Sequence, residues 1–127
     1  MAEDKIDLIK RNTVEIVNDK FILEFAKKVA EFCKKIPKDS INYGFISQLA
    51  RSSSSIGANY IEANESLSKK DFYHRIKICR KESKETVYWF EIVGYHNSQL
   101  FDESNILKAE ASEYLRLFSS IILKLNN

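Results

Sequence analysis

Glycine and proline are scarce in this sequence, which has three glycines and one proline among its 127 residues. An all-β sandwich needs many tight turns, and glycine and proline are among the residues that most often form them. Their scarcity therefore argues against that fold class. The 30% of charged and 44% of hydrophobic residues suit amphipathic helices instead. The sequence predicts an all-α protein.

Cysteine is also scarce, and the net charge is low. The two cysteines, Cys33 and Cys79, do not form a C-x-x-C pair and fall on apolar helix faces, which indicates reduced thiols in the core. The net charge is +2 and the pI is ≈ 8.5, well below the basic excess of a dedicated nucleic-acid coat protein. This charge permits nucleic-acid binding without requiring it.

Long hydrophobic runs are absent. No run approaches the ~18 apolar residues that would span a bilayer, and the first residues, Met1–Lys5, lack the apolar core of a signal peptide. Together with the reduced thiols, this predicts a soluble, cytoplasmic protein with no membrane partner.

Apolar residues recur at alternating spacings of three and four, which places them on one stripe of each expected helix. The pattern predicts helices at residues 18–36, 43–66, 69–96 and 102–125. Helices of this length with short connections favour an antiparallel up-down four-helix bundle, forming a single domain over residues 1–127. The apolar residues between Ile6 and Val17 leave two alternatives, a short extra helix or an arm, of which we favour the helix.

The clearest helix start lies at Ser68. Ser68 as N-cap with Asp71 three residues later is a variant of the capping box. Leu67 and Phe72 are spaced around this cap as a hydrophobic staple would be. These signals predict a helix that begins at Lys69.

Small residues occupy positions beside the apolar stripe of the second expected helix. Ala50, Ser53 and Gly57 stand where large residues would otherwise be expected. Glycine and serine lower helix propensity, by up to about 1 kcal/mol relative to alanine. Their presence predicts that a neighbouring helix comes close.

A basic ridge lies on the side of the third helix opposite its apolar stripe. At 100° per residue, the ridge consists of Lys70, His74, Lys77, Lys81 and Lys84. It extends over roughly 20 Å and could follow the phosphates of a nucleic acid. The alternative is a solvated face whose lysines pair with Glu82, Glu85 and other acids.

Beyond Lys84 the same outward side becomes aromatic. Tyr88, Ile92 and Tyr95 continue it, and Trp89 is close by. Contiguous exposed aromatic surface is typical of a binding site for a partner, so we interpret these four residues as an oligomer interface. The alternative is that the N-terminal segment of the same chain covers them.

Few residues could support catalysis or metal binding. His74 and His96 are the two histidines, and one loose pairing of Asp71 with His74 does not supply the ligands of a di-iron site. The serines at 52–55 lack the Gly-x-Ser-x-Gly pattern of a nucleophile, and Gly57 alone does not make a phosphate loop. We predict no catalytic residue, no metal and no cofactor, and hence no enzyme.

The sequence resembles the four-helix bundle proteins known as 23S rRNA intervening-sequence proteins. Four segments carry the resemblance: Gln48–Ser52, Ser55–Ala63, Ser68–Phe72 and Lys81–Trp89. The resemblance implies an up-down four-helix bundle that assembles into a ring-shaped homopentamer. It also implies that Arg51, Asn59, Glu62, Glu82 and Glu85 form a structural polar network between helices or subunits.

A related branch of that family is the accessory variability protein of diversity-generating retroelements, which binds nucleic acid and a reverse transcriptase through a basic surface. The resemblance therefore leaves two hypotheses of function. The first is a non-enzymatic, homo-oligomeric accessory protein that binds RNA or DNA weakly and without sequence specificity. The second is a scaffold that binds another protein and has no role with nucleic acid.

Overall fold

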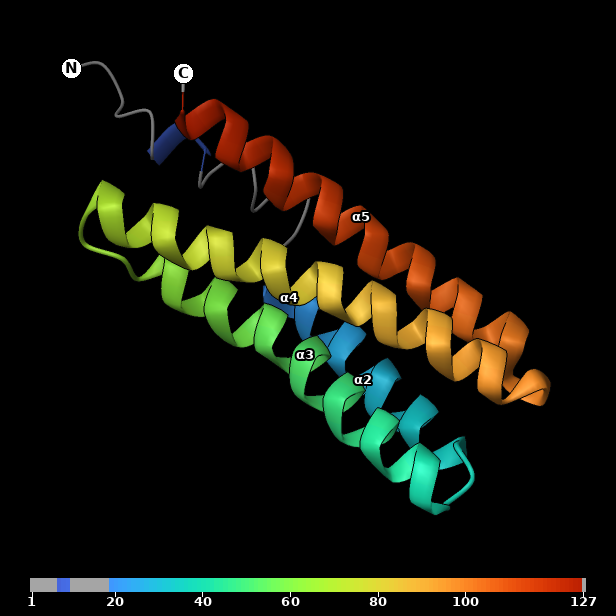
Figure 1. Cartoon of the computed structure of the whole chain (residues 1–127). Coiled ribbons are helices and arrows are strands. Elements are labelled where there is room, and N and C mark those ends of the chain that lie inside the picture. Colours follow the sequence, from blue (N-terminus) through green and yellow to red (C-terminus); the bar gives the residue numbers. More distant parts are fainter. Residues whose placement is uncertain (1–6, 10–18, 127) are drawn as a thin grey trace.

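The protein is built from four long helices, as the sequence predicts. The computed structural model describes residues 7–9 and 19–126. The elements are α2 (Asp19–Lys35), α3 (Ser40–Asn64), α4 (Lys69–His96), a short 3-10 turn η1 (Ser98–Leu100) and α5 (Phe101–Leu125) (Figure 1). The all-α prediction is confirmed.

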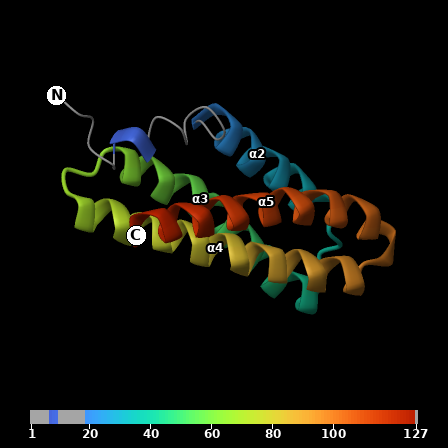
Figure 2. The same cartoon turned by 90° about the horizontal axis from the view of Figure 1, so that it is seen from above.

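The helices form an antiparallel bundle in which α4 packs on both α3 and α5, and α2 packs on α3 (Figures 1 and 2). Side chains of α2 and α5 close the bundle. Phe25 meets Tyr114 with ring centroids 5.2 Å apart, and Lys35 Nζ lies 2.8 Å from Glu103 Oε1. Because the residue numbers rise along α2 as they fall along α5, these two helices run antiparallel.

Helix starts follow local capping chemistry. The Asp39 carboxylate accepts hydrogen bonds from the backbone N–H groups of Ile41 and Asn42, so α3 starts at Ser40 rather than at the predicted residue 43. Ser68 Oγ accepts from the Asp71 N–H at 3.1 Å, which confirms the predicted cap of α4. The predicted staple is wrong, because Leu67 is 98% exposed while Phe72 is buried, so the two residues do not pack together.

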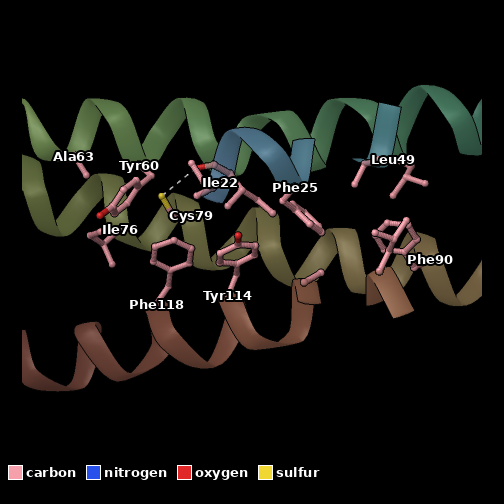
Figure 3. Close-up of a cluster of buried hydrophobic side chains, with 14 of the residues drawn as sticks. Ile22, Phe25, Leu49, Tyr60, Ala63, Ile76, Cys79, Phe90, Tyr114 and Phe118 are labelled. Atoms are coloured by element: carbon pink, nitrogen blue, oxygen red, sulfur yellow. Dashed lines mark hydrogen bonds between the residues drawn. The ribbon is translucent and has the colours of Figure 1, made fainter. Parts of the chain in front are cut away.

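The core consists of the predicted apolar stripes. The apolar stripe of the first expected helix is buried at all five positions, which are Ile22, Phe25, Val29, Phe32 and Ile36. The stripe of α4 is buried at all seven, which are Phe72, Ile76, Cys79, Ser83, Thr86, Phe90 and Val93. Figure 3 shows rings from α2, α3 and α5 meeting at the centre, where Tyr60 packs against Phe118 with centroids 6.2 Å apart. The strongly β-prone run at residues 86–93 is helical because its spacing buries one side of α4.

The small residues of α3 allow one close contact. A Cβ added at Gly57 would lie 3.5 Å from Ile22 Cγ2, so α2 is the helix that approaches there. Ser53 is buried beside it, whereas Ala50 is exposed. Both cysteines are buried and free, as predicted.

The predicted N-terminal helix lies largely outside the described residues. Residues 7–9 are helical, and Ile9 is buried as part of the hydrophobic core. Among the helices of the described part of the chain, none combines the length and the apolar character needed to cross a membrane.

Candidate functional site

The basic ridge is an exposed surface of α4. Lys70, His74, Lys77, Lys81 and Lys84 all lie exposed along this helix. Four of them, His74, Lys77, Lys81 and Lys84, line a depression of ≈ 440 Å³ together with Ile78 and Arg80. Lys77 Nζ lies over the Tyr73 ring, 5.1 Å from its centre, in a cation–π contact. The ridge therefore combines exposed cationic side chains with a depression in the surface.

The ridge lysines are not neutralised by the rest of the described protein. None of Lys70, Lys77, Lys81 and Lys84 forms an ion pair with a described residue, whereas many other surface lysines do. Those paired lysines are Lys27, Lys28, Lys34, Lys35 and Lys108. The positive charge of the ridge is thus available to an external anion.

The acids that could have neutralised the ridge are held by α3. Arg51 Nη1 lies 3.1 Å from Glu82 Oε2, and Arg51 Nη2 contacts Glu85 Oε2. Gln48 Oε1 accepts a further hydrogen bond from Arg51 Nε at 3.2 Å. Glu82 is buried and Glu85 half-buried, so the guanidinium compensates two carboxylates that water reaches poorly.

A second polar link joins α3 and α4, near the C-terminal end of α3 and the N-terminal end of α4. Arg75 Nη1 donates to Asn59 Oδ1 at 3.0 Å, and Asn59 Nδ2 donates to the carbonyl of Ser55 at 2.9 Å. The structure therefore brings Asn59 to Arg75, and Arg51 to Glu82 and Glu85.

Glu62 does not join this network within the described residues of one chain, so its part in a network between helices or subunits stays a prediction. It lies exposed on α3, and its side chain forms no hydrogen bond or ion pair with another described residue. Its position on the helix explains this, because an exposed carboxylate is solvated by water and gains little from a protein cation.

The predicted oligomer interface, here called the aromatic patch, consists of Tyr88, Trp89, Ile92 and Tyr95, and only the two tyrosines are exposed. Tyr88 is 58% and Tyr95 88% exposed, while Ile92 is half-buried. Trp89 packs towards α3, with its ring centroid 6.2 Å from that of Phe45 and 5.1 Å from that of Tyr88. Its indole nitrogen is buried and has no hydrogen-bond partner in the structure. Tyr88 and Tyr95 are thus the residues that face outward.

Two buried contacts near the ends of the helices were not anticipated from the sequence. Asn42 and Asn97 exchange side-chain hydrogen bonds of 2.9 and 3.0 Å, and Ser104 Oγ donates to the Phe90 carbonyl at 2.7 Å. Both join residues distant in sequence or in different helices. The signal in the sequence was that Asn42, Asn97 and Ser104 stand at positions where the helical spacing would place apolar residues.

Burial is the main cause of the raised pKa values of core side chains. It raises the pKa of the Cys79 thiol from its ordinary 9.0 to about 12 and the pKa of Tyr114 from 10.0 to about 12. Cys79 Sγ lies 3.6 Å from the Ile56 carbonyl, to which it donates. Within the described residues, no three His, Cys, Asp or Glu side chains gather as metal ligands would.

Residues 19–120 match the family described as 23S rRNA-intervening sequence protein. The chain belongs to this family. The match extends over the four long helices, including both the basic ridge and the polar network. The predicted resemblance to the 23S rRNA intervening-sequence proteins is confirmed.

A solved structure also supports membership of this family. It is a protein of unknown function from the S23 ribosomal protein family of Bacteroides thetaiotaomicron, 30% identical, with a TM-score of 0.75. The similarity covers 84% of this chain and 98% of that chain. A comparison with curated proteins found no match. Neither description names an enzymatic activity.

Proposed function

We propose that this chain is a non-enzymatic, homopentameric bundle protein that binds nucleic acid weakly and without sequence specificity. The observation that supports this most is the basic ridge, whose four lysines have no acidic partner in the described part of the chain. The acids next to Lys81 and Lys84 in the sequence, Glu82 and Glu85, are bound to Arg51. A surface of unpaired cations on a straight helix is suited to a phosphate backbone.

The magnitude of the charge sets the strength of binding. With +2 per chain, a pentamer carries about +10, a modest excess for a particle of that size. Lysines contact phosphates as point charges and release counterions, so affinity should fall steeply with salt. Binding is therefore strongest at low ionic strength.

The aromatic patch supports the oligomer. Tyr88 and Tyr95 are exposed on the same side of α4, and tyrosines in such positions are frequent hot spots of protein interfaces. Light scattering of the purified chain measures the assembly directly. A mass of one chain at micromolar concentration would contradict the oligomer.

Fluorescence anisotropy with a labelled RNA and a labelled DNA duplex tests the nucleic-acid role. We expect binding of both at about 50 mM salt and a large loss at about 200 mM. The variant Lys77→Glu/Lys81→Glu should lose binding to both probes. Its matched control is Lys20→Glu/Lys124→Glu, which changes the net charge equally at two exposed lysines outside the ridge.

The outcomes separate the ridge from the total charge. Equal losses in both double variants would contradict a site on the ridge. No binding by the unaltered protein at low salt would overturn the nucleic-acid role and favour a scaffold that binds another protein.

A further inference from the structure

A furrow runs along the seam between α2 and α5. Two depressions of ≈ 260 Å³ and ≈ 450 Å³ share Glu24 and Lys28 in their walls, so they are neighbours along the seam, and we call the pair the seam furrow. Phe21 lies towards one end and Ile106 towards the other. The helices are bridged within it by Lys28 and Glu110, whose charged atoms are 2.8 Å apart.

The seam furrow is acidic. Its walls contain two lysines, Lys27 and Lys28, and the glutamates Glu24, Glu31, Glu103, Glu110 and Glu113. One carboxylate oxygen of Glu110, Oε2, is buried without a hydrogen-bond partner in the structure. Glu113 forms no ion pair with any described residue. The other four glutamates each pair with a lysine: Glu24 with Lys27, Glu110 with Lys28, Glu31 with Lys34 and Glu103 with Lys35. The furrow therefore keeps one carboxylate without a cation, Glu113, and one free acceptor, Glu110 Oε2.

The seam furrow also exposes apolar surface among these charges. The Ile106 side chain is 71% exposed, and Leu117 and Tyr114 line the hollow farther along. A suitable occupant would be an apolar or aromatic helix face that carries positive charge.

The outward side of α4 has these properties and a matching length. It carries Lys84 followed by Tyr88 and Tyr95, with the ridge lysines continuing beyond. The stretch from Lys84 to Tyr95 is about 17 Å long, and the α2 wall from Phe21 to Glu31 is about 15 Å long. The two surfaces match in apolar character and extent, and Lys84 offers a cation to Glu113, which has none among the described residues.

Symmetry requires such a pair of different surfaces. In a closed ring of five copies, neighbours are related by rotation about the ring axis and not by a two-fold axis, so the interface is heterologous. Each copy must then present two distinct faces. The patch on α4 and the furrow between α2 and α5 lie on different helices, with α3 and α5 on either side of α4, so one copy can use both at once.

We infer that the α4 patch of one copy, centred on Tyr88 and Tyr95, docks into the seam furrow of the next copy. This inference rests on the proposed homo-oligomer and names the surface that its aromatic patch meets. In the docked state, Lys84 approaches the furrow glutamates, while Lys70 and Lys77 stay outside and remain open to nucleic acid.

Two variants, each with one altered face, test this inference by light scattering. The patch variant is Tyr88→Glu/Tyr95→Glu, and the furrow variant is Ile106→Lys/Glu113→Lys. All four side chains are exposed, so circular dichroism should show unchanged helix content. We expect each variant alone to have the mass of one chain. An equal mixture should give a heterodimer, because the intact patch of one variant fits the intact furrow of the other.

The remaining outcomes decide against the inference in distinguishable ways. A furrow variant that still assembles like the unaltered protein would overturn the docking into the furrow and leave the oligomer intact. A mixture that stays monomeric would also overturn it. If the unaltered protein is itself monomeric, the proposed oligomer and the docking both fail.

Discussion

Arg51 and Glu82 form an ion pair between α3 and α4, with 3.1 Å between Nη1 and Oε2. Glu82 is buried and Arg51 is half-exposed, so the pair fixes a carboxylate inside the bundle while the cation keeps contact with water. The same guanidinium contacts Glu85. This arrangement ties both acids to the α3 side of α4 and leaves the basic ridge without them.

Replacing Arg51→Ala should destabilise the fold by about 2 kcal/mol, because the buried Glu82 loses its cation and keeps its desolvation cost. Urea unfolding followed by circular dichroism measures the change. The control is Lys34→Ala, which removes only an exposed pair with Glu31 and should cost less than about 1 kcal/mol. Equal losses in the two variants would show that Arg51 has no special role.

Two glycines in helices should respond oppositely to alanine. Nothing lies within 4 Å of a Cβ added at Gly44, so Gly44→Ala should stabilise the protein by about 1 kcal/mol through helix propensity. A Cβ at Gly94 would lie 3.1 Å from Ser104 Oγ and 3.2 Å from Ser104 Cβ. Gly94→Ala should therefore destabilise it by about 1 kcal/mol. Thermal unfolding of both variants compares them, and the same sign of change in both would refute the prediction.

The Cys79 thiol should lower the stability of the protein in alkaline solution. Burial raises its folded-state pKa from 9.0 to about 12. Above pH 9 the unfolded chain loses this proton while the folded chain keeps it, so the free energy of unfolding falls as the pH rises from about 9 towards 12. The decrease should be shallower in Cys79→Ala. Urea titrations of both proteins at several pH values measure the two slopes.

The same burial predicts slow chemistry at the thiols. A thiol reagent added at pH 8 should react with Cys33 and Cys79 only slowly in the folded protein and rapidly in urea, because the thiolate is the reactive form. Absorbance after addition of the reagent follows both reactions. Fast reaction of both thiols without urea would contradict their buried positions.

A single ridge lysine should change the salt dependence of binding. Lys81→Ala should reduce the slope of the logarithm of affinity against the logarithm of salt concentration by about 0.9 for duplex DNA, since one phosphate contact is lost. Lys124→Ala on α5 should leave that slope unchanged, because this exposed lysine lies outside the ridge. Anisotropy titrations at four salt concentrations supply the slopes. An unchanged slope for Lys81→Ala would place the phosphate contacts elsewhere.

The apolar spacing predicted the helices and the buried side of each, because a helical repeat of 3.6 residues places such residues on one stripe. Ser68 could be recognised as a cap since its partner, Asp71, is three residues away. The Leu67 staple failed because side-chain packing, and not spacing, decides whether an apolar residue before a cap turns inward.

The candidate sites were predictable to different degrees. The ridge follows from positions along one helix, so its residues could be identified without any tertiary information. The partners of Arg51 could not, since the spacing along one helix does not tell which side chains of a neighbouring helix it meets. The packing of α3 on α4 brings Glu82 and Glu85 to Arg51.

The sequence by itself determined the all-α class, the four helices, the buried stripes and the line of cations on α4, because each depends on residues within one or two turns of each other. Only the tertiary structure decided which cations remain unpaired, which polar groups meet, and that a furrow opens between α2 and α5. Those properties depend on the mutual placement of helices distant in the chain, which is set by how their side chains pack together.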